Sequence, residues 1–181
     1  MTLEDLKNYQ VSVRKTVDIT YRGYKLYSCS SPSSGSVALS ILKIIEGYNM
    51  SDPKIRDLNF HRLDEAMRFS YAARGELGDP DFFNYMDGFE AQLLQPKTAS
   101  HIREQISDHH THNVSDYGPK GYALPENHGT SHIVTIDDSG MSITLTSTVN
   151  LLFGSQLVVP ETGMQTLAHN FQQETDRKQE L

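Results

Sequence analysis

Apolar and polar residues alternate in two parts of the chain, which is the pattern of strands that cover one face and expose the other. The first part, residues 11–27, is interrupted by Arg22-Gly23. The second part, residues 133–149, is interrupted by Asp137-Asp138-Ser139-Gly140. Because Gly, Asp and Ser favour turns, each part predicts two antiparallel strands joined by a tight turn.

Between these two hairpins the apolar residues recur every three or four positions, which is the spacing of a helix face. This spacing predicts long helices over residues 37–45, 60–71 and 96–107, whereas residues 82–94 show no clear pattern. A Thr followed three positions later by an acid predicts a shorter helix after Thr2. Strands and helices together predict the α+β fold class. The side chains expected on the solvent side of the second long helix are Arg62, Asp64, Glu65 and Arg68.

Residues 108–128 show neither the alternation of a strand nor the three-to-four-residue spacing of a helix. A stretch of this length is unusual as a connection inside a compact domain, so we expect it to be functional or to be the place where the chain is opened. It contains His109, His110 and His112, with His101 and Asp108 nearby, which raises the alternative of a metal site. A stable zinc site needs three or four convergent ligands, and adjacent residues of an extended chain point in different directions. We therefore expect an exposed loop and no metal.

The charge balance changes which partners are plausible. Lys and Arg number 16 and Asp and Glu number 23, which gives a formal net charge of −7, and no basic stripe is present. Nucleic-acid binding is therefore not expected, since it requires clustered cations.

No apolar run approaches the roughly 18–20 residues of a membrane span, and residues 1–10 lack the basic and apolar regions of a secretory signal. Cys29, the single cysteine, is expected to be a small residue near a strand end.

The register of the second hairpin can be derived from its turn. If residues 138–140 form a three-residue loop, Asp137 lies opposite Met141. Counting back along both strands then places Thr130 opposite Thr148, to within about one residue of slippage at a bulge. Two threonine hydroxyls are therefore expected to meet at the open end of this hairpin.

Gly129-Thr130, at the junction between the long loop and a strand, has the residue types that self-cleavage requires. The Thr130 hydroxyl can attack the carbonyl of Gly129, and hydrolysis of the resulting ester leaves an N-terminal Thr. The free α-amine, with a reference pKa of about 7.7–8.0, suits a general base for its own hydroxyl. A turn followed by a strand explains the same pair without chemistry. His132 is expected on the same strand face as Thr130, in a packing or hydrogen-bonding role.

Several motifs resemble one known family, the γ-glutamyltransferases, also called glutathione hydrolases. Gly-Thr-Ser-His, Ser-Thr-Val-Asn-Leu-Leu-Phe-Gly-Ser and Val-Pro-Glu-Thr-Gly are similar to the start of that family's small subunit. Pro-Ser-Ser-Gly, His-Arg-Leu with Glu-Ala-Met-Arg-Phe, and Leu-Gly-Asp-Pro are similar to the end of its large subunit. The three small-subunit motifs occupy residues 129–132, 147–155 and 159–163, and the three large-subunit motifs occupy residues 32–35, 61–69 and 77–80.

The resemblance implies an incomplete N-terminal nucleophile hydrolase fold, in which two sheets pack between layers of helices as an αββα sandwich. It divides the chain into three regions. Residues 1–129 would be the C-terminal part of a large (α) subunit, residues 130–163 the start of a small (β) subunit, and residues 164–181 a divergent polar tail. The two subunits would arise by self-cleavage and remain together as a heterodimer.

The resemblance also implies an activity and its residues. Thr130 would be the nucleophile, Thr148 the second threonine whose hydroxyl supports it, and Asn150 the residue that binds the α-amino and carboxylate end of the γ-glutamyl group. Glutathione and other γ-glutamyl compounds would be the donors. Water, an amino acid or a dipeptide would accept the group, with no cofactor. Members of the family are extracytoplasmic or vacuolar, some of them membrane-associated.

Parts of the family pattern have no counterpart in this sequence, which leaves a second interpretation open. The pattern continues after Gly163 with an acidic segment that binds the substrate amine, a Ser-Ser pair and a Gly-Gly oxyanion hole, and it includes an earlier Arg for the substrate carboxylate. An oxyanion hole accounts for several kcal/mol of transition-state stabilisation. The alternative is therefore a catalytically inactive, truncated homologue that binds a partner or has no function.

Overall fold

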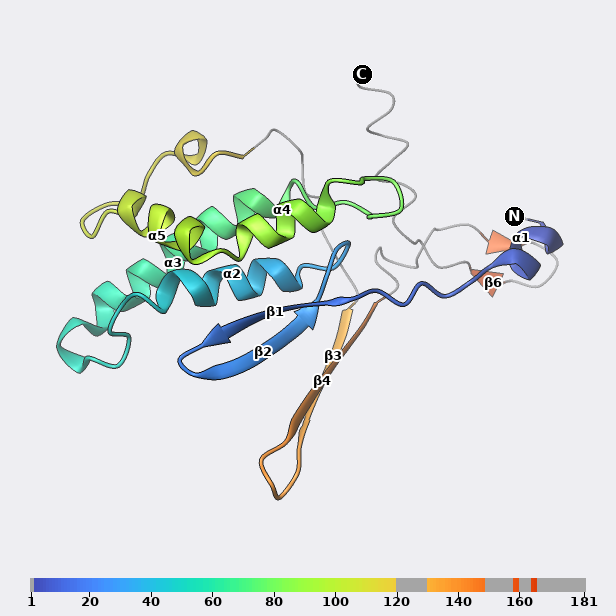
Figure 1. Cartoon of the computed structure of the whole chain (residues 1–181), viewed down its shortest axis with the longest axis horizontal. Helices are drawn as coiled ribbons and strands as arrows, with labels where there is room; N and C mark the ends of the chain where they lie inside the picture. The colour runs from blue at the N-terminus through green and yellow to red at the C-terminus, as the bar shows by residue number, and fades with distance from the viewer. Residues whose placement is uncertain (1, 120–129, 149–157, 160–163, 166–181) are drawn as a thin grey trace. The chain divides into compact units, whose positions relative to one another are not determined.

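The computed structural model describes residues 2–119, 130–148, 158–159 and 164–165, and it is shown in Figure 1. The chain divides into two compact units, Met1–Ala123 and Leu124–Leu181. Each unit is described separately below.

The first unit contains the hairpin predicted near the start of the chain. Strand β1 (Thr16–Tyr21) pairs antiparallel with β2 (Tyr24–Cys29), with Thr16 opposite Cys29. Arg22 and Gly23 connect them with φ angles of 49° and 88°, and two positive φ values are what a type I′ turn requires. Cys29 lies at the end of β2, as predicted, and it is exposed.

The predicted start of this hairpin at residue 11 was wrong, because residues 11–15 form no strand. Strand β2 ends at Cys29, and the chain turns immediately afterwards through Ser30 and Ser33, where the Ser33 N–H donates to the Ser30 carbonyl over 3.1 Å. Residues 11–15 therefore have no opposing strand in this hairpin, and alternation alone does not make a strand without a pairing partner.

The helices occur where the apolar spacing predicts them, and one more occupies the region without a clear pattern. The three longest correspond to the predicted helices over residues 37–45, 60–71 and 96–107. The bounds are α1 Leu3–Asn8, α2 Gly35–Ile45, α3 Arg56–Arg74, α4 Met86–Leu93 and α5 Pro96–Gln105, with short 3₁₀ turns η1 at Pro53–Ile55 and η2 at Val114–Tyr117.

Helix α2 lies at the centre of the first unit. It packs against β1 and β2 on one side and against α3, α4 and α5 on the other, as Figure 1 shows. The apolar core joins α2, α3 and α5 to η2 and consists of Ile44, Ile45, Ala66, Phe69, Ala99, Ile102 and Tyr117. Small buried residues allow α2 and α3 to approach closely, and the Ser70 hydroxyl donates to that of Ser40 over 3.4 Å.

The turn that leads into α2 is closely packed. A Cβ at Gly35 would collide with the carbonyl oxygen of Cys29, so this position accepts only glycine without a backbone shift. Ser34 precedes the helix, but its hydroxyl accepts a 2.9 Å hydrogen bond from Arg74 Nε instead of capping the helix. The buried Ser31 N–H donates to the Glu90 carboxylate of α4 over 3.0 Å.

The predicted solvent side of α3 was wrong at Glu65, which is fully buried. Glu65 and Phe69 are four residues apart, so they share the face that packs against Tyr117. The apolar residues Phe60 and Tyr71, in contrast, are 64% and 51% exposed. The position of the packing face of α3 therefore follows its neighbours more closely than the hydrophobicity of its own residues.

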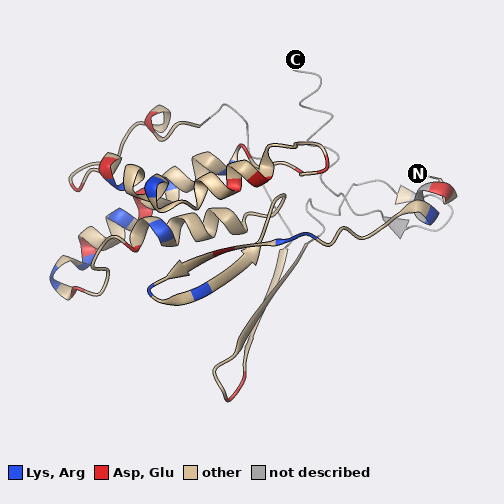
Figure 2. Cartoon of the chain, in the orientation of Figure 1, with Lys and Arg blue, Asp and Glu red and all other residues tan. Residues whose placement is uncertain are grey.

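The second unit contains the second predicted hairpin. Strand β3 (Thr130–Ile136) pairs antiparallel with β4 (Ser142–Thr148), and a short pair, β5 (Val158–Val159) with β6 (Met164–Gln165), follows. The acidic residues of the β3–β4 hairpin lie at its tip, coloured red in Figure 2, and the rest of the hairpin has no Asp, Glu, Lys or Arg. Within the part of the chain that the structure describes, no helix has the length and the apolar run needed to cross a membrane.

Candidate active site

The two threonines that the sequence analysis paired lie opposite each other in the structure. Thr130, the first residue of β3, is the register partner of Thr148, the last residue of β4. The Thr130 hydroxyl donates a hydrogen bond to the Thr148 hydroxyl, with 3.1 Å between the two Oγ1 atoms. The predicted register is therefore confirmed without slippage.

The two hydroxyls meet because of the kind of pair that they occupy. At the closed end of the hairpin the Asp137 N–H donates to the Met141 carbonyl over 3.0 Å, which makes this a hydrogen-bonded pair. Such pairs alternate with non-hydrogen-bonded pairs, in which the Cα atoms are only about 4.5 Å apart and the side chains lie closer. The Thr130–Thr148 pair is seven pairs away from the Asp137–Met141 pair. Because seven is an odd number, Thr130 and Thr148 form a non-hydrogen-bonded pair.

His132 lies on the same face of β3 as Thr130, as predicted. It is opposite Thr146, another non-hydrogen-bonded pair, and its Nδ1 is 2.8 Å from the Thr146 hydroxyl. The imidazole is therefore held across the two strands next to the threonine pair. This contact agrees with the hydrogen-bonding role expected for His132.

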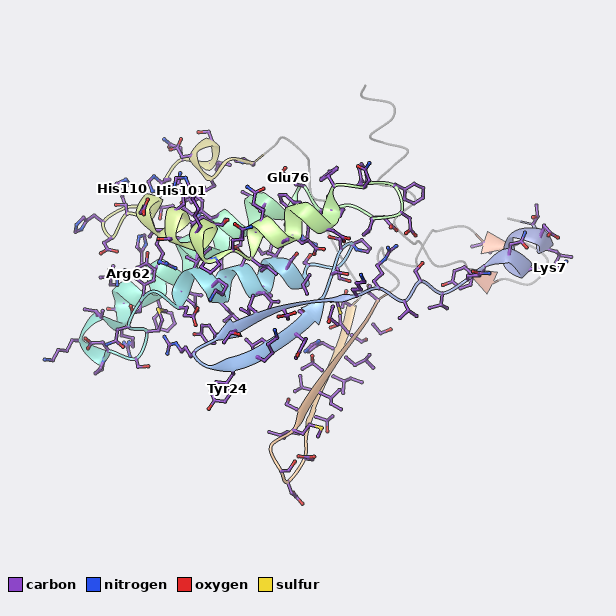
Figure 3. The ribbon with its side chains drawn as sticks, in the orientation of Figure 1. Lys7, Tyr24, Arg62, Glu76, His101 and His110 are labelled. Carbon is purple, nitrogen blue, oxygen red and sulfur yellow. The ribbon has the colours of Figure 1, made fainter. Side chains whose placement is uncertain are left out.

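The opposite face of the hairpin is more apolar. Ile133 pairs with Leu145, and Thr135 pairs with Ile143. The three apolar side chains are 60–62% exposed. Figure 3 shows side chains projecting to both sides of the two strands. The β3–β4 hairpin thus has one face with hydroxyls and an imidazole around Thr130, which also carries Val134 and Ile136 nearer the tip. The opposite, aliphatic face carries Ile133, Ile143 and Leu145 interspersed with Ser and Thr.

Two of the predicted site residues lie outside the described residues. These are Gly129, on the other side of the predicted cleavage bond, and Asn150, the predicted ligand for the γ-glutamyl end. The structure therefore brings together Thr130, Thr148 and His132 out of the residues that the sequence analysis singled out around this site.

The histidines of the long loop have hydrogen-bond partners near the end of α5. His112 Nε2 is 2.8 Å from the Gln105 carbonyl, and His110 Nδ1 is 2.9 Å from the Ser107 hydroxyl. Figure 3 labels His101 and His110 at this end of the helix layer. Over residues 2–119 and the described strands of the second unit, no three His, Cys, Asp or Glu side chains gather in a way that could hold a metal ion.

A buried network that the sequence pattern did not predict fixes the first part of the long loop. The Tyr117 hydroxyl donates to the Glu65 carboxylate, with distances of 2.9 and 3.0 Å to the two oxygens, and it accepts a 3.0 Å hydrogen bond from the His112 N–H. The Tyr117 ring also packs edge-on against Phe69, with 4.9 Å between ring centroids. Burial raises the pKa of Tyr117, and the hydrogen bond to Glu65 raises it further. The spacing of apolar residues along a helix cannot reveal that a buried acid bonds to a Tyr more than fifty residues away in sequence.

An ion pair fixes the same segment to α3 a few residues earlier. Arg62 donates to Asp108 through Nε and Nη2, at 2.8 and 2.6 Å, in a two-pronged geometry. The hydrogen bonds from Arg62 lower the pKa of Asp108. Since Asp108 and Tyr117 are both anchored, the expectation of a plain exposed loop is correct for most side chains from 108 to 116 but misses the anchoring of the segment.

The chain is similar to known proteins over most of its length. The family described as "Gamma-glutamyltranspeptidase" matches residues 1–179. The glutathione hydrolase proenzyme of Arthroderma benhamiae is 48% identical over 167 residues, and the glutathione hydrolase of Aspergillus flavus is 44% identical over 165 residues. Each alignment covers 91% of this chain and 28% of the relative. The chain therefore spans little more than a quarter of the length of these relatives.

Solved structures give the same result for the fold. The crystal structure of Helicobacter pylori gamma-glutamyltranspeptidase matches with a TM-score of 0.57 and 34% identity, over 68% of this chain and 36% of that one. The Pseudomonas nitroreducens enzyme, complexed with L-DON, matches with a TM-score of 0.54 and 26% identity, over 66% and 36% of the two chains. The expected fold class, α+β with part of an N-terminal nucleophile hydrolase fold, is confirmed.

Proposed function

The chain belongs to the gamma-glutamyltranspeptidase family, and on this basis we propose that it carries the self-cleavage site and nucleophile of a γ-glutamyltransferase or glutathione hydrolase. The observation that supports this function most directly is the 3.1 Å hydrogen bond from the Thr130 hydroxyl to the Thr148 hydroxyl. It orients a hydroxyl oxygen at the first residue of a strand, where a newly formed N-terminus would lie.

The proposed self-cleavage starts with attack of Thr130 Oγ1 on the carbonyl carbon of Gly129. The bond between this carbon and the Thr130 nitrogen breaks, the nitrogen takes up the hydroxyl proton, and an ester forms between the two residues. Water then hydrolyses the ester, which leaves a carboxylate on Gly129 and a free hydroxyl and α-amine on Thr130. Residues 1–129 would become the end of a large subunit and residues 130–163 the start of a small one, with residues 164–181 as a polar tail.

The proposed transfer reaction uses both groups of the new N-terminal residue. The α-amine accepts the proton of the Thr130 hydroxyl, because its reference pKa of about 7.7–8.0 leaves a fraction of it unprotonated near neutral pH while keeping it basic enough to act as a general base. The oxygen attacks the γ-amide of glutathione, and the amine of the departing cysteinylglycine takes up a proton. Water, an amino acid or a dipeptide then receives the γ-glutamyl group from the Thr130 ester. Asn150 would bind the α-amino and carboxylate end of that group.

A specific observation supports the alternative of an inactive binding piece. Ile133, Ile143 and Leu145 are each about three-fifths exposed on the aliphatic face of β3–β4. A face of this kind gains free energy when other chain segments cover it. A chain that needs such a cover for its active geometry would bind a partner but turn over no substrate by itself.

Intact mass and N-terminal sequencing of the purified chain test the proposal, with Thr130→Ala as the control. We expect a new N-terminus at Thr130 in the wild type and an uncut chain in the variant, because the variant lacks the attacking oxygen. Hydrolysis of a γ-glutamyl anilide by the cut protein would then extend the result to turnover. An uncut wild type would support the inactive alternative, and cleavage in Thr130→Ala would exclude Thr130 as the nucleophile.

A further inference from the structure

The Asp137 carboxylate accepts several hydrogen bonds at the closed end of the β3–β4 hairpin. Its Oδ1 accepts from the Ser139 N–H at 2.9 Å, from the Ser139 hydroxyl at 2.6 Å and from the Met141 N–H at 2.9 Å. These hydrogen bonds, first of all the one from the Ser139 hydroxyl, lower the pKa of Asp137. One side chain thus connects three groups of the turn.

The hydrogen bond to Met141 completes a pair that the backbone alone leaves incomplete. The Asp137 N–H donates to the Met141 carbonyl, but the Asp137 carbonyl accepts from the Gly140 N–H, also over 3.0 Å. Gly140 has a φ of 87°, the left-handed conformation that closes a three-residue loop. The Met141 N–H therefore donates to the Asp137 carboxylate in place of the carbonyl, and this contact specifies which residue faces Asp137.

The pairing at the closed end determines the pairing at the open end. In the observed register Asp137 faces Met141 and Thr130 faces Thr148. A shift of one residue would place Ser147 opposite Thr130, and it would also move every side chain of the shifted strand to the other face. The Thr130–Thr148 hydrogen bond therefore depends on a turn that lies seven residues away, or about 23 Å along the strand.

Little else in the hairpin distinguishes one register from another. All residues of β3 and β4 are exposed, so burial of one face within the described part of the second unit does not select the register. Hydroxyl-bearing residues also alternate along β4, which would give Thr130 a hydroxyl partner in more than one alignment. Strands without a buried face are prone to shift their register, so the turn is the feature that selects the observed register.

We infer that Asp137 is a positioning residue for Thr130: its carboxylate fixes the three-residue loop, and the loop fixes the register that joins the Thr130 hydroxyl to that of Thr148. The inference rests on the proposed function for its catalytic consequence. The register itself can be measured whether or not the chain cleaves itself, so the two can fail separately.

The first test measures the register by disulfide cross-linking in the full chain, with Cys29 replaced by Ser. Val134→Cys with Thr144→Cys places two thiols at a non-hydrogen-bonded pair of the observed register. Val134→Cys with Ile143→Cys places them opposite each other in the register shifted by one residue, in which Ser147 would face Thr130. The ratio of the two cross-linking yields reports how strongly the observed register is preferred.

We expect Asp137→Ala to lower this ratio about tenfold, since the hydrogen bonds that it removes end on a charged group. Asp137→Asn keeps an acceptor oxygen and should restore most of the ratio. The matched control is Asp138→Ala, which removes the same charge from the same loop and should leave the ratio at the wild-type value. An unchanged ratio in Asp137→Ala would overturn the inference.

The second test measures the rate at which the Thr130 N-terminus appears, by intact mass, in the same Asp variants without the added cysteines. We expect Asp137→Ala to slow self-cleavage by about the factor found for the register, with recovery in Asp137→Asn. A lower register preference with an unchanged cleavage rate would overturn the positioning role. An uncut wild type would count against the proposed function, and the cross-linking ratio would still decide the part played by Asp137.

Discussion

At the scale of single residues, the threonine pair links the described geometry to the proposed chemistry. Thr148 Oγ1 accepts the hydrogen bond that orients Thr130 Oγ1, and both strands supply these atoms at their open ends. A hydrogen bond of this kind contributes about 1 kcal/mol, and orientation of an attacking atom adds to its effect on rate.

The first prediction concerns the acceptor. Thr148→Ala should slow the appearance of the Thr130 N-terminus about tenfold, because the nucleophilic hydroxyl loses its orienting partner. Thr148→Ser keeps the hydroxyl and should cleave at close to the wild-type rate. Time-resolved intact mass measures both variants. Equal rates for wild type and Thr148→Ala would remove Thr148 from the proposed mechanism.

A second residue-scale prediction concerns the buried acid of α3. Tyr117→Phe deletes the hydroxyl that donates to both oxygens of the Glu65 side chain, so a fully buried polar group loses a hydrogen-bond donor. Such a loss costs about 2–3 kcal/mol of unfolding free energy, which urea unfolding followed by circular dichroism would measure. Tyr71→Phe, on an exposed side chain of the same helix, is the control and should change stability by less than about 0.5 kcal/mol. Similar midpoints for the two variants would contradict this account.

At the scale of elements, Arg62 and Asp108 connect α3 to the segment that follows α5. The pKa of Asp108 is lowered in the folded state, so the pair stabilises the fold above the ordinary pKa of an aspartate, about 3.9, and its contribution is lost as the pH falls through the folded value. Asp108→Asn should therefore reduce the difference in urea midpoint between pH 6 and pH 3. Asp57→Asn, on the exposed start of α3, should retain the wild-type difference. An equal effect of the two variants would show that Asp108 is an ordinary surface charge.

The same scale shows what could be predicted from the sequence and what could not. Apolar spacing predicts α2, α3 and α5 because their buried faces repeat at the helical period. The turn residues from Asp137 to Gly140 predict the register of β3–β4 because loop length fixes pairing. The strand expected at residues 11–15 was wrong because β2 ends at Cys29 and offers it no partner, and the exposed Glu65 was wrong because its partner Tyr117 is 52 residues away in sequence. Local patterns carry no information about such partners.

At the scale of the whole molecule, strand edges and apolar faces govern solution behaviour. Within the described residues β1 pairs with β2 and β3 pairs with β4, so each hairpin has backbone groups free of ladder partners on its outer edges. Exposed edges next to aliphatic side chains favour pairing between copies of a chain. Self-association that increases with concentration is therefore expected.

The corresponding prediction is that Ile143→Lys reduces this association, because a charge on the aliphatic face of β4 opposes its pairing with another chain. Sedimentation velocity over a range of concentrations measures the effect as a smaller share of fast-sedimenting species. Ser33→Lys, on an exposed residue of the first unit, controls for the change in net charge. An equal reduction in both variants would attribute association to net charge and not to the hairpin face.

The position of Cys29 has a practical consequence. It is the single thiol of the chain, and it lies exposed at the end of β2, directly beside the turn into α2 where Gly35 meets its carbonyl oxygen. A maleimide fluorophore would therefore label one site, in the unit that does not contain Thr130. Its emission would report on the unfolding of the first unit, at the point where β2 leads into α2.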